Sequence, residues 1–148
     1  MGNICRSPAA EIVFRKMVVE AGLAEDFQID SAGTIGFHEG NPPDRRMSVH
    51  LLNRGYVVEG KSRPLRKADL EDFDLLLTMD EENFTDTLRL DPEGKFHGKV
   101  KPFVGYLREN EAPGIPDPYY GGDQGFAHVI DLLEDGCTML LEELSEKK

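Results

Sequence analysis

The chain has 148 residues, of which 39% are hydrophobic and 30% are charged, a usual balance for one globular domain. Its formal net charge of −11 argues against binding to nucleic acid or to an anionic membrane surface. No apolar run is long enough to cross a membrane, no signal peptide is recognisable, and two cysteines are too few for a disulfide framework. We therefore expect a single domain over residues 1–148, located in the cytoplasm.

The amino end of the chain has the composition of an anion-binding loop. A glycine, small polar residues and an arginine lead to Pro8, which suits the first position of a helix. Residues 8–22 then carry apolar side chains at helical spacing, and Gly22 is a typical helix stop. Backbone amides in such a turn, together with the positive potential at a helix amino terminus, favour a bound oxyanion.

Three segments predict β-strands, namely 27–31, 74–79 and 100–107. Residues 74–79 give the clearest prediction, because a continuous apolar run is typical of a parallel strand buried on both faces. Pro102 weakens the third prediction, since proline cannot donate a hydrogen bond to a neighbouring strand.

Helices are expected over residues 44–54, 80–88 and 123–146, and the last of these has an apolar stripe at helical spacing. Loops lie at 36–45 and 111–122, and the second of them is rich in proline and glycine. No internal repeat and no linker divides the chain, so strands and helices simply alternate along it.

This alternation predicts an α/β fold, a three-layer doubly wound parallel sheet with helices on both faces. Ligands of such sheets lie at the carboxyl ends of the strands, in the turns that lead to helices. The opening loop has the helix that follows it but not the strand that should precede it. We therefore expect four strands in the complete fold, with the first, directly ahead of Met1, missing from this sequence.

The segment Gly2–Pro8 (GNICRSP) resembles the active-site loop of the low-molecular-weight protein tyrosine phosphatases, whose signature is Cys-x-Gly-Asn-x-Cys-Arg-Ser. The similarity continues, in the family's order and approximate spacing, through four more blocks: Ser31–Thr34, Gly40–Asp44, Phe73–Asp80 and Asp117–Gly121. These blocks extend from the first loop to the last helix. The resemblance therefore covers the whole chain and not one motif.

The resemblance implies an enzyme that hydrolyses phosphotyrosine monoesters through a phosphocysteine intermediate. Arg6 matches the arginine whose planar guanidinium grips two phosphate oxygens. Six residues are expected to bind the phosphate: Gly2, Asn3, Ile4, Cys5, Arg6 and Ser7. Three residues are expected to support the loop: Asn3, Ser7 and Ser31.

Asp117 matches the family's general acid, which protonates the leaving phenolate and then helps to activate water. Phe37, Tyr119 and Tyr120 resemble the aromatic walls of the substrate cleft. The resemblance implies no metal and no cofactor. The expected partner is a tyrosine-phosphorylated protein or a small aryl phosphate, and we expect a monomer or a weak dimer.

The chain departs from the family pattern at two positions. The family's nucleophilic cysteine precedes the loop glycine by two residues, which places it just ahead of Met1, so the 148 residues contain no nucleophile. Cys5 is the second cysteine of the loop and is not expected to replace it, although a disulfide with the nucleophile is an open alternative. Gly60 occupies a position where the family often has a histidine that supports the loop, and Arg63 is a remaining candidate for that support.

Two explanations compete for the absent cysteine. The sequence is either an amino-terminally incomplete form of an active phosphatase, which we favour, or an inactive relative that binds phosphate or phosphotyrosine without turnover. Arsenate reduction on the same scaffold needs two further cysteines near the middle of the chain. None lies between Cys5 and Cys137, and Cys137 is expected to be a core residue on the apolar stripe of the last helix.

Overall fold

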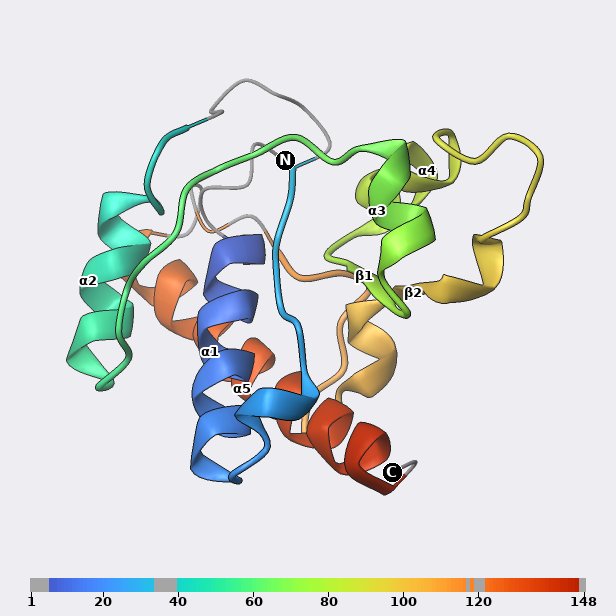
Figure 1. Cartoon of the computed structure of the whole chain (residues 1–148). Coiled ribbons are helices and arrows are strands. Elements are labelled where there is room, and N and C mark those ends of the chain that lie inside the picture. The colour runs from blue at the N-terminus through green and yellow to red at the C-terminus, as the bar shows by residue number, and fades with distance from the viewer. Residues whose placement is uncertain (1–5, 34–39, 117, 119–121, 147–148) are drawn as a thin grey trace.

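The computed structural model describes residues 6–33, 40–116, 118 and 122–146, and Figure 1 shows how their helices and strands are arranged. The α-helices are α1 (Arg6–Glu20), α2 (Arg45–Asn53), α3 (Lys67–Asp72), α4 (Glu81–Leu88) and α5 (Gly122–Glu146). The strands are β1 (Leu76–Thr78) and β2 (Val100–Pro102). Single turns of 3₁₀ helix are formed by η1 (Ala24–Asp26), η2 (His97–Lys99) and η3 (Phe103–Tyr106).

The core lies where α1 and α2 pack against α5 (Figure 1). The stripe predicted for the last helix is confirmed, because Phe126, Val129, Ile130 and Leu133 of α5 have no exposed surface. Cys137, on the same stripe, is also buried, as expected. No helix in the described part of the chain combines the length and the apolar character that crossing a membrane requires.

Side-chain caps fix the starts of the shorter helices. The carboxylate of Asp44 accepts the backbone N–H groups of Arg46 and Met47 at the start of α2. Asp80 caps α4 in the same way, by accepting the N–H of Asn83. These caps satisfy amides that lack a partner in the first turn of a helix. They therefore set the starts of α2 and α4 at Asp44 and Asp80, where the predicted helices begin.

The strands β1 and β2 form a parallel pair in which Leu76 lies opposite Val100 and Thr78 opposite Pro102. The strand predicted over 100–107 is therefore too long. It ends at Pro102, and the chain turns at once into η3. Proline explains the early end, because it has no N–H with which to extend the pairing.

Residues 27–31 are extended but belong to no strand of the described sheet, which has the order β1–β2. Phe27 has φ −129° and ψ 139°, and the side chains alternate between half-buried and exposed as in a strand. Two residues after this segment, Gly33 forms an isolated parallel bridge with Pro64. The expected sheet of four strands, the first of them missing, is thus represented in the described residues by two strands and one extended segment.

Candidate active site

The guanidinium of Arg6 is fixed at the amino end of α1. The residue is 6% exposed, and its Nη1 donates hydrogen bonds to Asp80 Oδ2 at 2.8 Å and to the carbonyl oxygen of Ile115 at 2.6 Å. The three groups come from three segments, namely the first residue of α1, the residue that caps α4 after β1, and the loop at 111–116. The sequence predicted a functional arginine at this position, and the structure buries it and gives its Nη1 two hydrogen-bond acceptors.

Asp80 holds this arginine and caps α4 at the same time. Its Oδ1 accepts the backbone N–H of Asn83 at 2.8 Å, while Oδ2 accepts from Arg6. Burial raises the pKa of the Asp80 carboxyl, but the hydrogen bonds from Asn83 and Arg6 and the charge of Arg6 outweigh it and lower the pKa below the ordinary value. Asp80 is therefore a carboxylate at neutral pH, and its Oδ2 orients the guanidinium of Arg6.

The loop at 111–116 packs closely on the end of β1. Ile115 donates its backbone N–H to the carbonyl oxygen of Met79 at 2.6 Å. A Cβ added at Gly114 would lie 3.2 Å from Asp80 Cβ and 3.3 Å from its Cα, so this approach favours glycine. The loop is therefore anchored two residues before position 117, the predicted general acid, which itself lies outside the described residues.

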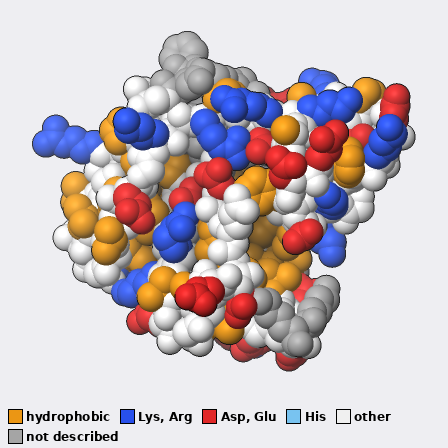
Figure 2. Space-filling model, in the orientation of Figure 1, with side chains coloured by type: hydrophobic (Ala, Val, Ile, Leu, Met, Phe, Trp, Pro, Cys, Tyr) orange, Lys and Arg blue, Asp and Glu red, His pale blue; other side chains and the backbone are white. Residues whose placement is uncertain are grey.

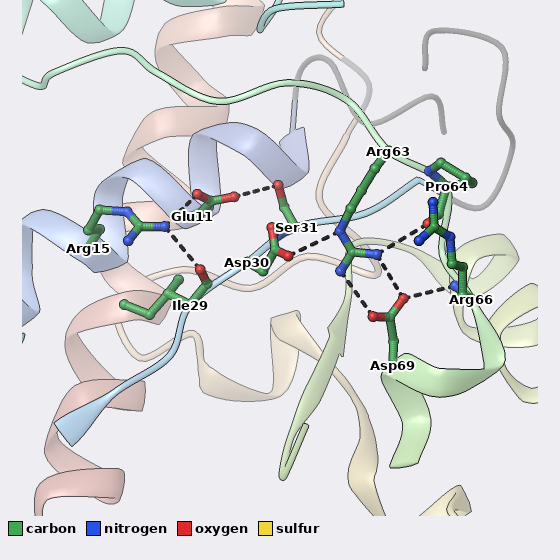
Figure 3. A network of polar contacts seen from close by, with 9 residues as sticks. All are labelled: Glu11, Arg15, Ile29, Asp30, Ser31, Arg63, Pro64, Arg66 and Asp69. Atoms are coloured by element: carbon green, nitrogen blue, oxygen red, sulfur yellow. Dashed lines mark hydrogen bonds and ion pairs between the residues drawn. The ribbon is translucent and has the colours of Figure 1, made fainter. Parts of the chain in front are cut away.

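Ser31 is held by a residue of α1. Its Oγ donates to Glu11 Oε1 at 2.7 Å, as Figure 3 shows. The other carboxylate oxygen of Glu11 accepts from Arg15 Nη2 at 2.6 Å, and the same nitrogen of Arg15 donates to the carbonyl oxygen of Ile29 at 3.0 Å. Glu11 and Arg15 thus fix the extended segment 27–31 against α1, with Ser31 at the last position of the segment.

Arg63 ties the same segment to α3 (Figure 3). Its Nε lies 3.1 Å from Asp30 Oδ2, and its two terminal nitrogens donate to the two oxygens of Asp69 at 2.9 and 3.1 Å. Asp69 also accepts the backbone N–H of Arg66 at 2.8 Å, which fixes the start of α3. Burial raises the pKa of Asp69, but the hydrogen bonds from Arg63 and Arg66 lower it by more. The pKa of Asp69 therefore lies below its ordinary value.

Gly60, where the resemblance expects a histidine, has a φ of 105°, a conformation that residues with a side chain rarely adopt. The backbone at this position is therefore shaped for glycine. Arg63, Glu11 and Arg15 all make polar contacts with the extended segment.

Of the predicted site residues, the structure describes Arg6, Ser7 and Ser31. Ser7 is half-buried in the first turn of α1. The others lie outside the described residues: Gly2, Asn3, Ile4, Cys5, Phe37, Asp117, Tyr119 and Tyr120.

Four contributors were missed by the sequence interpretation: Glu11, Asp69, Asp80 and the carbonyl of Ile115. The sequence could have indicated Asp80, because it follows an apolar strand directly and precedes a helix. A carboxylate at that position lies at the edge of the sheet where ligands bind, and it can also cap the helix. Among the described residues, no group of three or more His, Cys, Asp or Glu side chains could hold a metal ion.

Cys137 has a setting that opposes thiol reactivity. It is 1% exposed, and burial raises the pKa of its thiol far above the ordinary value, with a smaller contribution from the charge of Glu134. A thiol held in its protonated form is a poor nucleophile, so Cys137 has the properties of a core side chain.

Comparison with known proteins gives a match over the whole chain. A sequence model of the low molecular weight phosphotyrosine protein phosphatases matches residues 1–148. A Synechocystis protein assigned to the low molecular weight protein-tyrosine-phosphatases is 48% identical over 147 residues, which cover 99% of this chain and 94% of that protein. The low molecular weight phosphotyrosine protein phosphatase of Homo sapiens is 37% identical over 143 residues, covering 97% and 90% of the two chains.

Solved structures agree with the sequence matches. A protein tyrosine phosphatase from Entamoeba histolytica, with Hepes in its active site, superimposes with a TM-score of 0.95 at 42% identity, covering 99% of this chain and 94% of that one. The YfkJ protein of Bacillus subtilis gives a TM-score of 0.93 at 36% identity, covering 100% and 92%. These likenesses confirm the α/β fold predicted from the sequence.

Proposed function

Because the chain belongs to the low molecular weight phosphotyrosine protein phosphatase family, we propose that it serves the hydrolysis of phosphotyrosine monoesters through a phosphocysteine intermediate. Membership of the family makes it a protein-tyrosine-phosphatase by descent. The observation that carries the proposal is the fixed guanidinium of Arg6 at the amino end of α1, next to the residues of the signature loop.

Arg6 and the loop at 2–7 form the proposed phosphate site. A guanidinium can bind two phosphate oxygens at once, and the amides at a helix start add positive potential. Asp80 and the Ile115 carbonyl fix Nη1 of the guanidinium before substrate arrives, so little reorganisation is needed when charge develops on the transferring phosphoryl group. In this proposal Asn3, Ser7 and Ser31 support the loop.

The chemistry needs a thiolate and an acid. We place the thiolate directly ahead of Met1, where the family signature has its first cysteine. It forms an S–P bond while the P–O bond to the tyrosyl oxygen breaks, and Asp117 gives its proton to the leaving phenolate. The Asp117 carboxylate then takes a proton from a water molecule whose oxygen attacks phosphorus, which releases inorganic phosphate and regenerates the thiolate.

The proposed substrate is the phosphotyrosine of a protein or a small aryl phosphate, with Phe37, Tyr119 and Tyr120 forming the walls of the cleft. No metal and no cofactor takes part in these steps. We place the protein in the cytoplasm as a single domain over 1–148, monomeric or weakly dimeric, without nucleic acid or membrane partners.

A second candidate function follows from the cysteines that the 148 residues contain. Cys137 is buried, and Cys5 is the second cysteine of the loop. With no thiol at the first signature position, the same guanidinium and amides would bind phosphate or phosphotyrosine without turnover. Titration of the 148-residue protein with inorganic phosphate, followed by calorimetry, measures this binding directly.

The test of the enzyme proposal compares two proteins, the 148 residues alone and the same chain preceded by an apolar strand that ends in cysteine at the position before Met1. We expect vanadate-sensitive hydrolysis of p-nitrophenyl phosphate and of a phosphotyrosine peptide from the longer protein only. Replacement of the added cysteine by serine should abolish turnover and leave phosphate binding intact.

Two substitutions in the longer protein assign the roles. Arg6→Lys should lower kcat about 100-fold or more, because lysine cannot bind two oxygens in one plane. Asp117→Asn should lower kcat by a factor of about 10²–10⁴, with the larger loss for substrates that have poor leaving groups. The enzyme proposal is rejected if the longer protein folds but shows no vanadate-sensitive hydrolysis.

A further inference from the structure

Two large apolar side chains are exposed on the outer side of α2. Val49 is 49% exposed and Leu52 is 58% exposed, and together with the exposed Arg45 they follow a spacing of four and then three residues. Side chains at this spacing lie along one side of a helix. Figure 2 shows hydrophobic side chains gathered over α2. We call the row of Arg45, Val49 and Leu52 the α2 face.

The other sides of α2 are occupied by contacts with the core and with α5. Met47 and Leu51 have no exposed surface. Arg54, just after the helix, forms ion pairs with Asp131 at 2.9 Å and with Glu134 at 2.7 Å, both on α5. Of the four large hydrophobic residues that are exposed in the described part of the chain, three lie between positions 49 and 57. The α2 face is therefore a local concentration of exposed apolar surface.

The exposure of the α2 face does not arise from the point at which the sequence begins. The cavity of about 460 Å³ between the extended segment 27–31 and β1 offers room for the strand expected ahead of Met1. No residue of α2 lines this cavity, so a strand placed there leaves Val49 and Leu52 exposed.

The segment that carries the α2 face is basic within an acidic chain. Residues 44–67 contain seven Lys or Arg and two Asp or Glu, whereas the whole chain has a formal net charge of −11. The helix α2 itself has no carboxylate side chain, and Arg45 forms no ion pair with any described residue. A surface with a free cation at one end and apolar side chains beyond it is complementary to an acidic partner that also carries apolar residues.

Two other occupants fit this charge pattern less well. A symmetric contact between two copies through α2 would place one basic helix against another, because α2 has no Asp or Glu. An anionic membrane faces a whole side of the molecule and would be repelled by a chain of net charge −11. A short acidic segment meets neither objection, because it responds mainly to the charges within a Debye length of α2.

The amino end of α2 lies close to the segment that carries the predicted general acid. The guanidinium of Arg46, in the first turn of α2, lies 5.0 Å from the ring centroid of Phe126. The neighbouring Gly125 packs on Pro118, since an added Cβ would lie 3.1 Å from the Pro118 carbonyl oxygen. Pro118 directly follows Asp117 in the sequence, and the amino ends of α1 and α2 point to the same side of the molecule (Figure 1). One end of a segment bound along α2 would therefore lie near the proposed cleft.

From these observations we propose that the α2 face is a docking surface for an acidic, amphipathic helix of the tyrosine-phosphorylated protein substrate. Apolar side chains of that helix pack on Val49 and Leu52, and its carboxylates lie beside Arg45. Docking raises the effective concentration of the phosphotyrosine at the cleft, whereas a small aryl phosphate gains nothing from it. The role in turnover rests on the proposed phosphatase function, but binding of the helix does not.

The probe is the fluorescein-labelled peptide Glu-Leu-Ala-Glu-Leu-Leu-Glu-Glu-Leu-Ala-Glu-Leu-Leu-Glu, titrated with the 148-residue protein and followed by fluorescence anisotropy. Its leucines form one helical stripe. The matched peptide has the same composition in the order Leu-Glu-Leu-Glu-Ala-Glu-Leu-Glu-Leu-Glu-Ala-Glu-Leu-Leu, in which alternation replaces the stripe. We expect saturable binding of the first peptide and at least about tenfold weaker binding of the second. High salt should weaken binding of the first, since it screens the contact with Arg45.

Three variants locate the site. Leu52→Asp and Arg45→Glu place negative charge on the α2 face, and each should weaken binding of the first peptide about tenfold or more. Arg89→Glu is the matched control, because it makes the same change of charge at the end of α4, at a side chain that is 75% exposed. Figure 1 shows α4 at the opposite end of the molecule from α2, so this variant should bind as the unmodified protein does.

Kinetics of the longer protein that carries the added cysteine test the role in turnover. The substrate is a phosphotyrosine peptide joined to the first peptide by a flexible linker. Leu52→Asp should raise KM for this substrate about tenfold and leave its kcat unchanged. Hydrolysis of p-nitrophenyl phosphate should not change, because this substrate does not reach α2.

Four results would overturn the proposal. Equal binding of the two peptides would mean that charge alone attracts them, and unchanged binding to Leu52→Asp would place the peptide elsewhere. Tight binding of the protein to phosphatidylserine vesicles, lost in Leu52→Asp, would assign the α2 face to a membrane. A dimer of the 148-residue protein that Leu52→Asp separates would assign it to a second copy. Helix binding without any hydrolysis by the longer protein supports the docking surface and rejects only the proposed enzyme.

Discussion

Nη1 of Arg6 lies 2.8 Å from Oδ2 of Asp80, and this pair joins the first residue of α1 to the cap of α4 across 74 positions of sequence. The Arg6 side chain is 5% exposed and the Asp80 side chain 29%. The pair is thus partly desolvated, and each charge depends on the other. The position of Arg6, the residue proposed to bind phosphate, therefore depends on how the start of α1 packs against the start of α4.

Substitutions at Asp80 should separate its two tasks. Asparagine is as good a helix cap as aspartate, so Asp80→Asn should keep the bond to the Asn83 amide and lose the charged contact to Arg6, at a cost of about 1.5–3 kcal/mol. Asp80→Ala should cost about 1 kcal/mol more, because the cap is lost as well. Urea unfolding at neutral pH measures both changes.

A double-mutant cycle with Arg6→Met supplies the control. When the guanidinium is absent, Asp80→Asn should cost much less than in the unmodified protein, with a coupling of about 0.5–3 kcal/mol. Simple additivity of the two single changes would contradict a direct interaction between these side chains.

The Arg63–Asp69 contact predicts a dependence of stability on pH. The pKa of Asp69 lies below its ordinary value of 3.8 in the folded protein. The stabilisation is therefore complete above the ordinary pKa and is lost as the pH falls through the lower pKa of the folded state. Asp69→Asn should lower the free energy of unfolding by about 1–3 kcal/mol at pH 7, and this difference should shrink below about pH 4.

Urea unfolding at several pH values, compared between the two proteins, isolates Asp69 from the other carboxylates. Glu93→Gln is the matched control, because Glu93 forms an exposed ion pair with Lys95 and its side chain is 71% exposed. Its substitution should change stability by less than about 0.5 kcal/mol at any pH. A difference for Asp69→Asn that stays constant down to pH 3 would argue against linkage at this group.

The long helices could be predicted from sequence because they contain enough turns for their apolar stripes to be recognised, as in α5. The helix α3 was missed, since six residues make too few turns to show a period and Asp69 is its principal signal. The segment 27–31 was predicted to be a short strand. Its side chains do alternate, but a strand also needs a paired neighbour, which no local pattern supplies.

The candidate site divides in the same way. Arg6 and Ser31 were predicted to be site residues because they belong to recognisable sequence blocks. The partners that hold them, Asp80 and Glu11, are defined by contacts between distant segments. The Ile115 carbonyl is a backbone acceptor with no side-chain signature at all, so only the folded chain could identify it.

Substitutions at Gly60 test whether the stability of the protein depends on the backbone conformation there or on the absence of the histidine that the family often has. With φ at 105°, any side chain is strained there, so Gly60→His and Gly60→Ala should both cost about 1–3 kcal/mol. Gly98→Ala is the control, because Gly98 has no positive φ and nothing lies within 4 Å of its added Cβ. It should change stability by less than about 0.5 kcal/mol. A histidine variant clearly more stable than the alanine variant in thermal unfolding would show that the imidazole finds a partner.

Gly136 in α5 lies directly against Phe103 of η3. Alanine normally stabilises a helix interior by about 0.5–1 kcal/mol relative to glycine. Here, however, an added Cβ would clash with Cε1 and Cζ of Phe103, a side chain that is 1% exposed and cannot swing into solvent. Gly136→Ala should therefore destabilise the protein by about 1–3 kcal/mol, as overpacking does.

The opposing signs of these two effects make the Gly136 prediction sharp. Phe103→Leu shortens the opposing side chain and leaves a gap that the new methyl group can occupy. Gly136→Ala should thus be far less costly in the Phe103→Leu background, and it can become stabilising once the steric contact is gone and the helix preference remains. Chemical unfolding of the four proteins in this cycle measures the coupling, and equal costs in both backgrounds would mean that α5 and η3 do not meet at these two residues.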